Sequence, residues 1–225
     1  NTNGEILMKV AKSIPFSIIR KESAVLENSE ALLFGRSGLL EKEHEDTYFK
    51  DLKFRWIYIQ EKYKLKKIIV EPIQFFKHRP DNFPTIRLAQ LAQLYFSRHN
   101  LFSQVLEAKS VSDFYKIFNV QVSEYWKTHY QFDKESPKKR KSLTNSFIDL
   151  LLINTIIPLK FIYANSLGKD VSEDLIDLLN EIQAEKNVII EKFNNFGIES
   201  KSAFETQSLL QLKNEYCNQK RCMKC

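Results

Sequence analysis

The sequence predicts an all-α protein, an irregular multi-helix bundle of about ten helices with at most one short strand-like segment. Two observations lead to this prediction. The 225 residues include only 5 glycines and 6 prolines, whereas sandwiches and barrels need turn residues at short intervals. Apolar residues recur at helical spacing over most of the chain, and 17 Phe and 9 Tyr supply a bulky aromatic core.

The first third of the chain reads as helices separated by prolines and glycines. Helical spacing predicts one helix that ends at Pro15 and two more before Gly38. The clearest helix covers residues 45–63, where four apolar side chains fall on one stripe: Phe49, Leu52, Trp56 and Ile59. Residues 65–76 form the only stretch with β character, and Pro72 stops it.

Two of the six prolines lie in the stretch HRPDNFPTIRLAQLAQ, residues 78–93. Pro80 and Pro84 each disfavour helical geometry in the residue before them. Pro84 suits the first turn of a helix, where its missing N–H costs nothing. Apolar side chains follow from Leu88 at i, i+3, i+4 and i+7, so the prolines fix where a buried helix begins.

The second half of the chain is predicted to hold helices at 101–110 and 110–118, a short aromatic stretch at 122–132 and a long helix at 142–168. We expect the long helix to kink before Pro158. It contains the longest apolar tract, Phe147–Ala164, which is interrupted by Asp149, Asn154 and Lys160. A membrane span needs about 20 mostly uninterrupted apolar residues, so we expect a helix buried in protein and no membrane contact.

Three further helices are expected at 173–182, 187–197 and 203–216, the first capped by Ser172 and the last by a capping box of Ser202 and Glu205. The chain shows no internal repeat, no low-complexity linker and no clear boundary, which predicts a single helical domain over residues 1–225. The first residue is Asn, so we expect a piece of a longer protein. The first residues lack a secretory signal, which favours a cytoplasmic location.

The chain has a net charge of +6 and a pI of about 9.0, which allows a polyanionic partner without establishing one. The candidate anion-binding residues form two groups. Arg79, Asn82, Arg87 and Gln90 lie around a predicted helix start, where backbone N–H groups and planar guanidinium groups favour phosphate or carboxylate. The densest basic run supplies the second group, Lys138, Lys139, Arg140 and Lys141.

Each group also has a plainer interpretation. Asn82 and Arg87 could tie down their loop by internal hydrogen bonds, and the basic run could be an exposed loop. Trp126, His129 and Tyr130 could stack on bases, or they could fill the core.

All three cysteines fall within nine residues, as Cys217, Cys222 and Cys225 in a C-x4-C-x2-C pattern. This spacing predicts a metal site, either zinc or an iron–sulfur cluster, that needs a fourth ligand. Lys220 and Arg221 lie inside the loop and favour the thiolate forms. The alternative is a tail with free thiols, and an odd count argues against a disulfide scaffold.

The sequence contains no motif that predicts an enzyme. It has no Gly-rich phosphate loop, no nucleophile elbow, no zinc-protease motif and no carboxylate pair followed by lysine, as a metal-dependent nuclease would need. The four histidines are scattered. An active site would require His78, Arg79, Asn82 or His129 to converge in one pocket.

Four longer stretches together resemble a known family: RPDNFPTIRLAQLA, YWKTHY, LLLINTIIP and SAFETQSLLQLKNEYCNQKRCMKC. The family is bacterial, mostly from Bacteroidetes, and is classified only as a domain of unknown function. The resemblance implies members roughly twice this length, so that this chain would be the C-terminal helical half. It also implies an N-terminal half with acidic motifs like those of restriction-type nucleases, and a fourth cysteine-site ligand beyond residue 225.

The sequence therefore predicts a non-catalytic helical module that binds DNA or RNA through its basic residues. By the family resemblance, it would position the nucleic acid for the N-terminal domain. The alternative is a structural or protein–protein interaction module whose basic surface is incidental. A contiguous exposed apolar patch with dispersed lysines would favour that alternative.

Overall fold

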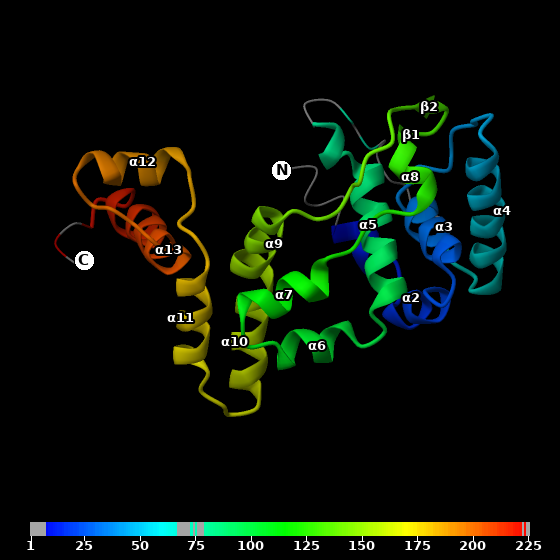
Figure 1. Ribbon diagram of the computed structural model, residues 1–225. Helices are drawn as coiled ribbons and strands as arrows, with labels where there is room; N and C mark the ends of the chain where they lie inside the picture. Colours follow the sequence, from blue (N-terminus) through cyan, green and yellow to red (C-terminus); the bar gives the residue numbers. More distant parts are fainter. Residues whose placement is uncertain (1–7, 67–72, 74, 76–78, 222, 224–225) are drawn as a thin grey trace. The chain divides into compact units, whose positions relative to one another are not determined.

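The fold is known from a computed structural model that describes residues 8–66, 73, 75, 79–221 and 223 (Figure 1). Nearly all of its regular secondary structure is helical, which confirms the predicted all-α class. The contacts within the chain group it into two units. Unit 1 holds residues 1–101 and 118–143, and unit 2 holds residues 102–117 and 144–225. The predicted single domain stays a prediction.

Unit 1 is built around α3 (Leu26–Arg36), a helix whose residues are buried on most sides. Its elements are α2 (Phe16–Glu22), α3 (Leu26–Arg36), α4 (Thr47–Lys62), the 3-10 turn η1 (Pro80–Asn82), α5 (Pro84–Ser97), α8 (Glu124–Thr128), β1 (His129–Gln131) and β2 (Lys134–Glu135). Helix α3 packs against both α4 and α5. The ring of Trp56 on α4 lies so close to Gly35 that a Cβ atom there would fall 2.2 Å from a ring carbon.

Aromatic side chains fill the core of unit 1, as the composition predicts. Phe34 stacks on Trp126 with ring centroids 5.2 Å apart. Phe132 meets Phe49 at 5.0 Å and Trp126 at 5.1 Å. All four rings are buried, so the predicted apolar stripe of α4 faces this core.

The strand pair does not lie where β character was expected. Strands β1 and β2 form an antiparallel hairpin within and just after the aromatic stretch 122–132, and Asp133 turns the chain with a φ of 59°. Within the predicted segment 65–76, residues 67–72, 74 and 76 lie outside the described residues. Its described residues, 65, 66, 73 and 75, form no strand.

Unit 2 holds the remaining helices. They are α6 (Leu101–Glu107), α7 (Val111–Phe118), α9 (Asn145–Leu151), the π-helical turn η2 (Leu152–Ile156), α10 (Ile157–Ser166), α11 (Ser172–Glu181), α12 (Val188–Asn195), α13 (Ala203–Gln211) and the π-helical turn η3 (Leu212–Cys217). Two side chains tie α6 and α7 to the long helix. The Lys160 ammonium donates to the carbonyl oxygens of Val105, Leu106 and Ala108, at 3.2, 3.0 and 2.6 Å, and Tyr115 donates to Asp149 at 2.7 Å.

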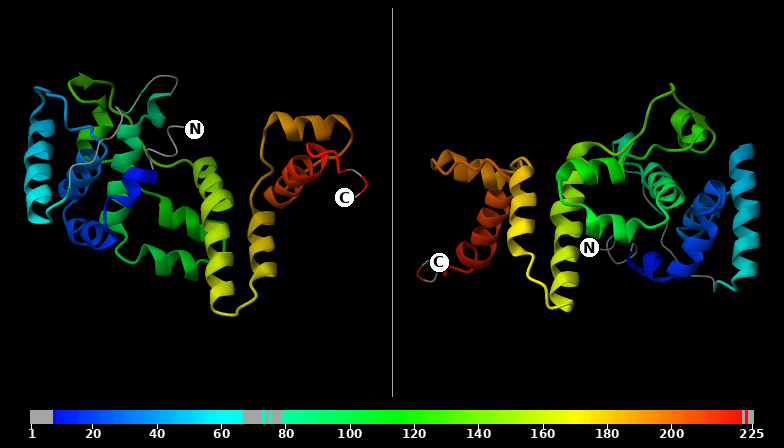
Figure 2. Two further views of the ribbon diagram at one scale, coloured as in Figure 1. Left: turned by 180° about the vertical axis from the view of Figure 1, so that it is seen from behind. Right: turned by 60° about the horizontal axis from the view of Figure 1, so that its bottom comes forward.

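The predicted long helix exists as the continuous run α9–η2–α10 (Figure 2). The expected distortion before Pro158 takes the form of η2. Proline has no N–H to donate to the carbonyl four residues earlier, and the helix widens there into a π-type turn. The Asn154 side chain donates to the Leu150 carbonyl oxygen at 2.9 Å on the same stretch.

The long helix is less buried than the sequence analysis expected. Residues 145–166 are long and apolar enough to cross a membrane. Their most apolar 18-residue window has a mean hydropathy of 1.7, and only 33 % of that window is buried. Leu150 is 47 % exposed and Ile162 is 66 % exposed. Core helices of soluble proteins pass the same length and composition test, so the absence of membrane contact stays a prediction.

The two predicted helix caps in unit 2 have different outcomes. Ser202 caps α13 as expected, because its hydroxyl oxygen accepts from the Glu205 N–H at 3.3 Å. The second bond differs from the predicted capping box, since the Glu205 carboxylate accepts from the Lys201 N–H at 2.5 Å instead of from the Ser202 N–H. The cap on α11 is different, since Val171 occupies the N-cap position and Asp170 accepts from the Ser172 N–H at 2.9 Å. A carboxylate at a helix N-terminus is favoured by the helix dipole, and here it replaces the serine hydroxyl.

Candidate anion-binding site

The start of α5 is where the sequence places it. Pro84 occupies the first turn of the helix, and Phe83 before it is extended, with a ψ of 143°. Pro80 begins the short turn η1 in the same way. The two prolines therefore hold the segment that carries Arg79, Asn82 and Arg87.

The structure brings Asn82, Arg87, Gln90 and Lys141 together. The Arg87 guanidinium donates to Asn82 Oδ1 at 2.6 Å and to Gln90 Oε1 at 2.9 Å. Gln90 Nε2 in turn donates to the Lys141 carbonyl oxygen at 3.4 Å. Burial lowers the pKa of Arg87, although Asp81 opposes this effect. These bonds are the internal tie that the plainer interpretation expected, and an anion contact of Arg87 stays a prediction.

A second set of contacts joins η1 to the basic run. The Lys139 ammonium lies 2.7 Å from Asp81 Oδ2, and the Tyr130 hydroxyl donates to Asp81 Oδ1 at 3.0 Å. The hydrogen bond from Lys139 holds the pKa of Asp81 below its usual value. The sequence analysis missed the role of Asp81, because its two partners lie about 50 residues away along the chain and no local motif marks them.

Lys141 differs from its three neighbours in the basic run. Its side chain is buried, and its ammonium donates to the carbonyl oxygens of Trp126 and His129 at 2.6 and 2.7 Å. It also lies 3.6 Å from the centroid of the Tyr130 ring. Burial lowers the pKa of Lys141 to about 8, so this lysine serves the interior of unit 1.

The remaining basic residues are exposed, and we call them the basic rim: Arg79, Lys138, Lys139 and Arg140. Lys138 lies 3.5 Å from Glu124, and Arg140 donates to Asn119 at 3.5 Å. Such long contacts between exposed groups are weak. The Arg79 carbonyl oxygen accepts from the Asn82 N–H at 2.8 Å, and within the part of the chain that the structure describes its side chain makes no hydrogen bond or ion pair. Arg79, Lys138 and Arg140 can therefore give charge to a ligand at little cost, whereas Lys139 is already paired with Asp81.

Charge is divided unequally between the two units. Unit 1 carries 23 Lys and Arg against 15 Asp and Glu, a net charge of +8, whereas unit 2 carries 11 against 13, a net charge of −2. The whole positive balance of the chain thus belongs to the unit that contains the basic rim.

Two of the described candidates for base stacking, Trp126 and His129, do not reach the rim. Trp126 is fully buried, and His129 stacks on Tyr125 with ring centroids 4.1 Å apart, so both fill the core. His78 lies outside the described residues. Cys217 is exposed in η3, while Cys222 and Cys225 are not described. Among the described side chains no group of three could hold a metal ion, and the zinc or iron–sulfur site stays a prediction.

A buried carboxyl group in unit 1 was not foreseen from the sequence. Glu30 on α3 is fully buried, and its Oε2 accepts from the Tyr48 hydroxyl and, at 3.3 Å, from the Trp126 indole N–H. Its Oε1 has no protein partner among the described residues. Burial raises the pKa of Glu30 to about 7. A lone glutamate in a helical stretch gives no sequence signal of such an environment.

Comparison with known proteins places the chain in a family without adding an activity. No curated protein and no solved structure matches it. One family model, described as protein of unknown function (DUF2851), matches residues 1–188. The match includes the basic rim and ends at Val188, the first residue of α12, before α13 and the three cysteines. The chain therefore belongs to the DUF2851 family of proteins of unknown function.

Proposed function

We propose that this chain is a non-catalytic module that binds the phosphate backbone of DNA or RNA through unit 1. The observation behind the proposal is the charge division, +8 in unit 1 against −2 in unit 2. Backbone binding needs several cations close together and no particular pocket, because each contact releases condensed counterions from the nucleic acid.

The contacts around the basic rim support this proposal. Arg79, Lys138 and Arg140 are exposed and make at most weak contacts. The turn that presents Arg79 is held in place by the bonds of Arg87 and Asp81. A fixed turn that carries exposed cations loses little conformational freedom when a phosphate binds. By the family resemblance, the module would hold the strand for a nuclease-like N-terminal half.

Charge reversal at the rim tests the proposal. Binding of fluorescein-labelled single-stranded and duplex oligonucleotides to the whole chain is measured by anisotropy over a salt series. For the variant Arg79→Glu/Arg140→Glu we expect affinity at least about ten-fold weaker at low salt. The slope of log K against log salt should also be less steep by about 1.5, because each lost phosphate contact removes about 0.7 to 0.9 from its magnitude.

The matched control is Lys186→Glu/Lys192→Glu, which reverses two exposed lysines of unit 2 and changes the net charge of the chain equally. It should change affinity by less than about three-fold. Equal losses in both variants would mean that the rim is no site. Absence of oligonucleotide binding by the unaltered chain at low salt would remove the proposal altogether.

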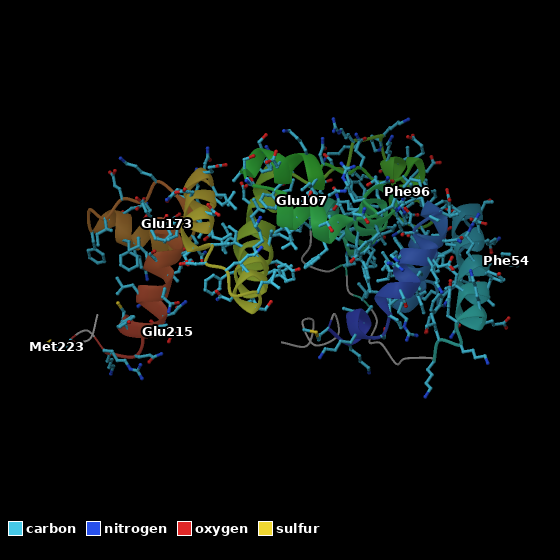
Figure 3. All side chains as sticks on the ribbon, turned by 90° about the horizontal axis from the view of Figure 1, so that it is seen from below. Phe54, Phe96, Glu107, Glu173, Glu215 and Met223 are labelled. Atoms are coloured by element: carbon cyan, nitrogen blue, oxygen red, sulfur yellow. The ribbon has the colours of Figure 1, made fainter. Side chains whose placement is uncertain are left out.

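A second candidate function, a protein–protein interaction module, is favoured by α4. Phe54, Ile57 and Tyr58 lie at i, i+3 and i+4 on this helix and are 74, 49 and 60 % exposed, and Figure 3 shows Phe54 on the outer side of α4. Sedimentation velocity over a concentration series tests for self-association through this stripe. Association that Phe54→Ser abolishes would support it, and a monomer at every concentration would count against self-association.

A further inference from the structure

A pocket of about 260 Å³ opens in unit 1, beside β1 and the first turn of α5. Gln131 of β1 and Thr85 of α5 both line it. The volume exceeds the roughly 150 Å³ cavity that admits benzene and falls just below the roughly 300 Å³ at which drug-sized sites begin. A pocket of this size suits a single planar ring system with a small substituent.

Among the residues that the structure describes, the lysine side chains are the charged groups in the pocket lining, beside the His44 ring. Within the described lining these are Lys42 and Lys134. Of the acidic residues near Lys42 in the chain, Glu43 pairs with Lys53 and Glu45 lies 2.8 Å from the Lys50 ammonium, whereas Glu41 is exposed. Lys42 and Lys134 place two cations in the lining, and these favour an anionic group there.

The walls of the pocket include two aromatic side chains, each of which packs against at least one other aromatic ring. Phe132 is buried and packs against Phe49 and Trp126 in the core. Phe75 meets the edge of Phe83 at 5.1 Å. Phe132 therefore closes the back of the pocket, and the partly exposed Phe75 ring is the surface on which an unpaired base would stack.

One polar group at the pocket can read the edge of a ring, and a second one holds the wall. Thr85 is almost fully buried, and its Oγ1 donates to the Tyr130 carbonyl oxygen at 2.6 Å, so it fixes β1 against α5. Gln131 offers both an amide donor and an acceptor. The His44 ring in the lining is held at its Nδ1, 2.5 Å from Asp133.

We propose that this pocket binds one nucleotide, with its base against Phe75 and Phe132 and its phosphate at Lys42 and Lys134. The inference rests on the proposed function and narrows it to single strands, because a base reaches a pocket only when it is unstacked. The pocket is linked to the basic rim through Asp81 in η1, which is bonded both by Tyr130, next to Gln131, and by Lys139 of the rim. A bound strand would then cross the rim and place one base in the pocket.

The first test asks whether the pocket needs both halves of a nucleotide. Isothermal titration calorimetry measures the affinity of the whole chain for AMP and UMP. It also measures the affinity for two fragments: adenosine, which lacks the anion, and ribose 5-phosphate, which lacks the base. We expect the nucleotide to bind about ten-fold more tightly than either fragment. Equal affinity of AMP and ribose 5-phosphate would overturn the base pocket.

The second test separates the pocket from the rim. A single strand and the same strand with abasic sites have identical backbone charge, so a base pocket predicts about ten-fold weaker binding of the abasic strand. Filling the pocket with Gln131→Trp should remove this difference while duplex binding is unchanged. Gln211→Trp, at an exposed position of unit 2, is the matched control, and circular dichroism confirms that both variants fold.

The outcomes distinguish the two proposals. If neither strand binds, the backbone-binding function falls, and the mononucleotide titration alone decides the pocket. If intact and abasic strands bind equally while AMP still binds, the pocket takes a free nucleotide and its placement on a strand is wrong. If the strands bind equally and AMP does not bind, the inference is overturned and the backbone-binding function stands.

Discussion

Replacing Glu30 with glutamine tests the protonation of a carboxyl group that unit 1 encloses completely. In the folded chain, burial raises the pKa of Glu30 from 4.5 to about 7 against the opposing hydrogen bonds of Tyr48 and Trp126. The folded state therefore keeps a proton that the unfolded state releases at lower pH. Its contribution to stability is fully present below about pH 4.5 and is lost as the pH rises through 7.

The size of this effect follows from the two pKa values. A rise from 4.5 to about 7 corresponds to about 3 kcal/mol in the free energy of unfolding, most of which is lost between pH 5 and pH 7.5. Other perturbed groups act outside this window. Lowered carboxyl pKa values, as at Asp46 and Asp81, have their effect below it, and the lowered pKa of Lys141 has its effect from about pH 8 upward.

Urea unfolding followed by far-ultraviolet circular dichroism at pH 5, 6 and 7.5 measures this dependence. The unaltered chain should lose about 2 to 3 kcal/mol across the series, whereas Glu30→Gln, which cannot ionise, should lose almost none of it. Glu61→Gln, at an exposed position of α4, should keep the full dependence. A Glu30→Gln slope equal to that of the unaltered chain would refute the assignment of the buried proton to Glu30.

Two further substitutions test packing and internal bonding in unit 1. Gly35→Ala would place a Cβ atom 2.2 Å from the Trp56 ring and should lower the free energy of unfolding by about 1 to 3 kcal/mol. In a double-mutant cycle with Trp56→Leu, measured by urea unfolding, most of that loss should disappear, and simple additivity would contradict the clash. Lys141→Met keeps the length of the side chain but leaves the Trp126 and His129 carbonyl oxygens without their donor, so it should cost about 2 to 5 kcal/mol. It should also abolish the rise in stability between about pH 8 and pH 10.5 that the lowered lysine pKa predicts, and a rise that survives in the pH series would disprove that role.

Local sequence signals predicted the elements whose causes are local. The proline at the start of α5 and the apolar stripe of α4 depend on residues within a few positions of each other, and both are confirmed. The strand pair depends instead on an Asp133 with positive φ and on pairing with residues after it. Without a glycine at the turn, the aromatic stretch gave no hairpin signal.

The candidate site shows the same limit. All four residues of the run 138–141 look equivalent as sequence, yet Lys141 alone is buried, because Trp126 and Tyr130 enclose it only in the folded chain. Asp81 likewise meets Lys139 across 58 positions. Sequence identifies which charges are available, and the fold decides which of them point inward.

The π-helical turn η2 lies between the two residues through which the long helix bonds α7 and the end of α6. In an unbroken α-helix, residues 11 positions apart point within about 20° of each other, whereas one extra residue in a turn swings everything after it by about 100°. Asp149 before the turn is bonded by Tyr115 of α7, and Lys160 after it, 11 positions later, holds the end of α6. The widened turn before Pro158 therefore sets the rotation of Lys160 about the helix axis relative to Asp149. It thereby fixes how one continuous helix bonds two consecutive helices, α6 and α7.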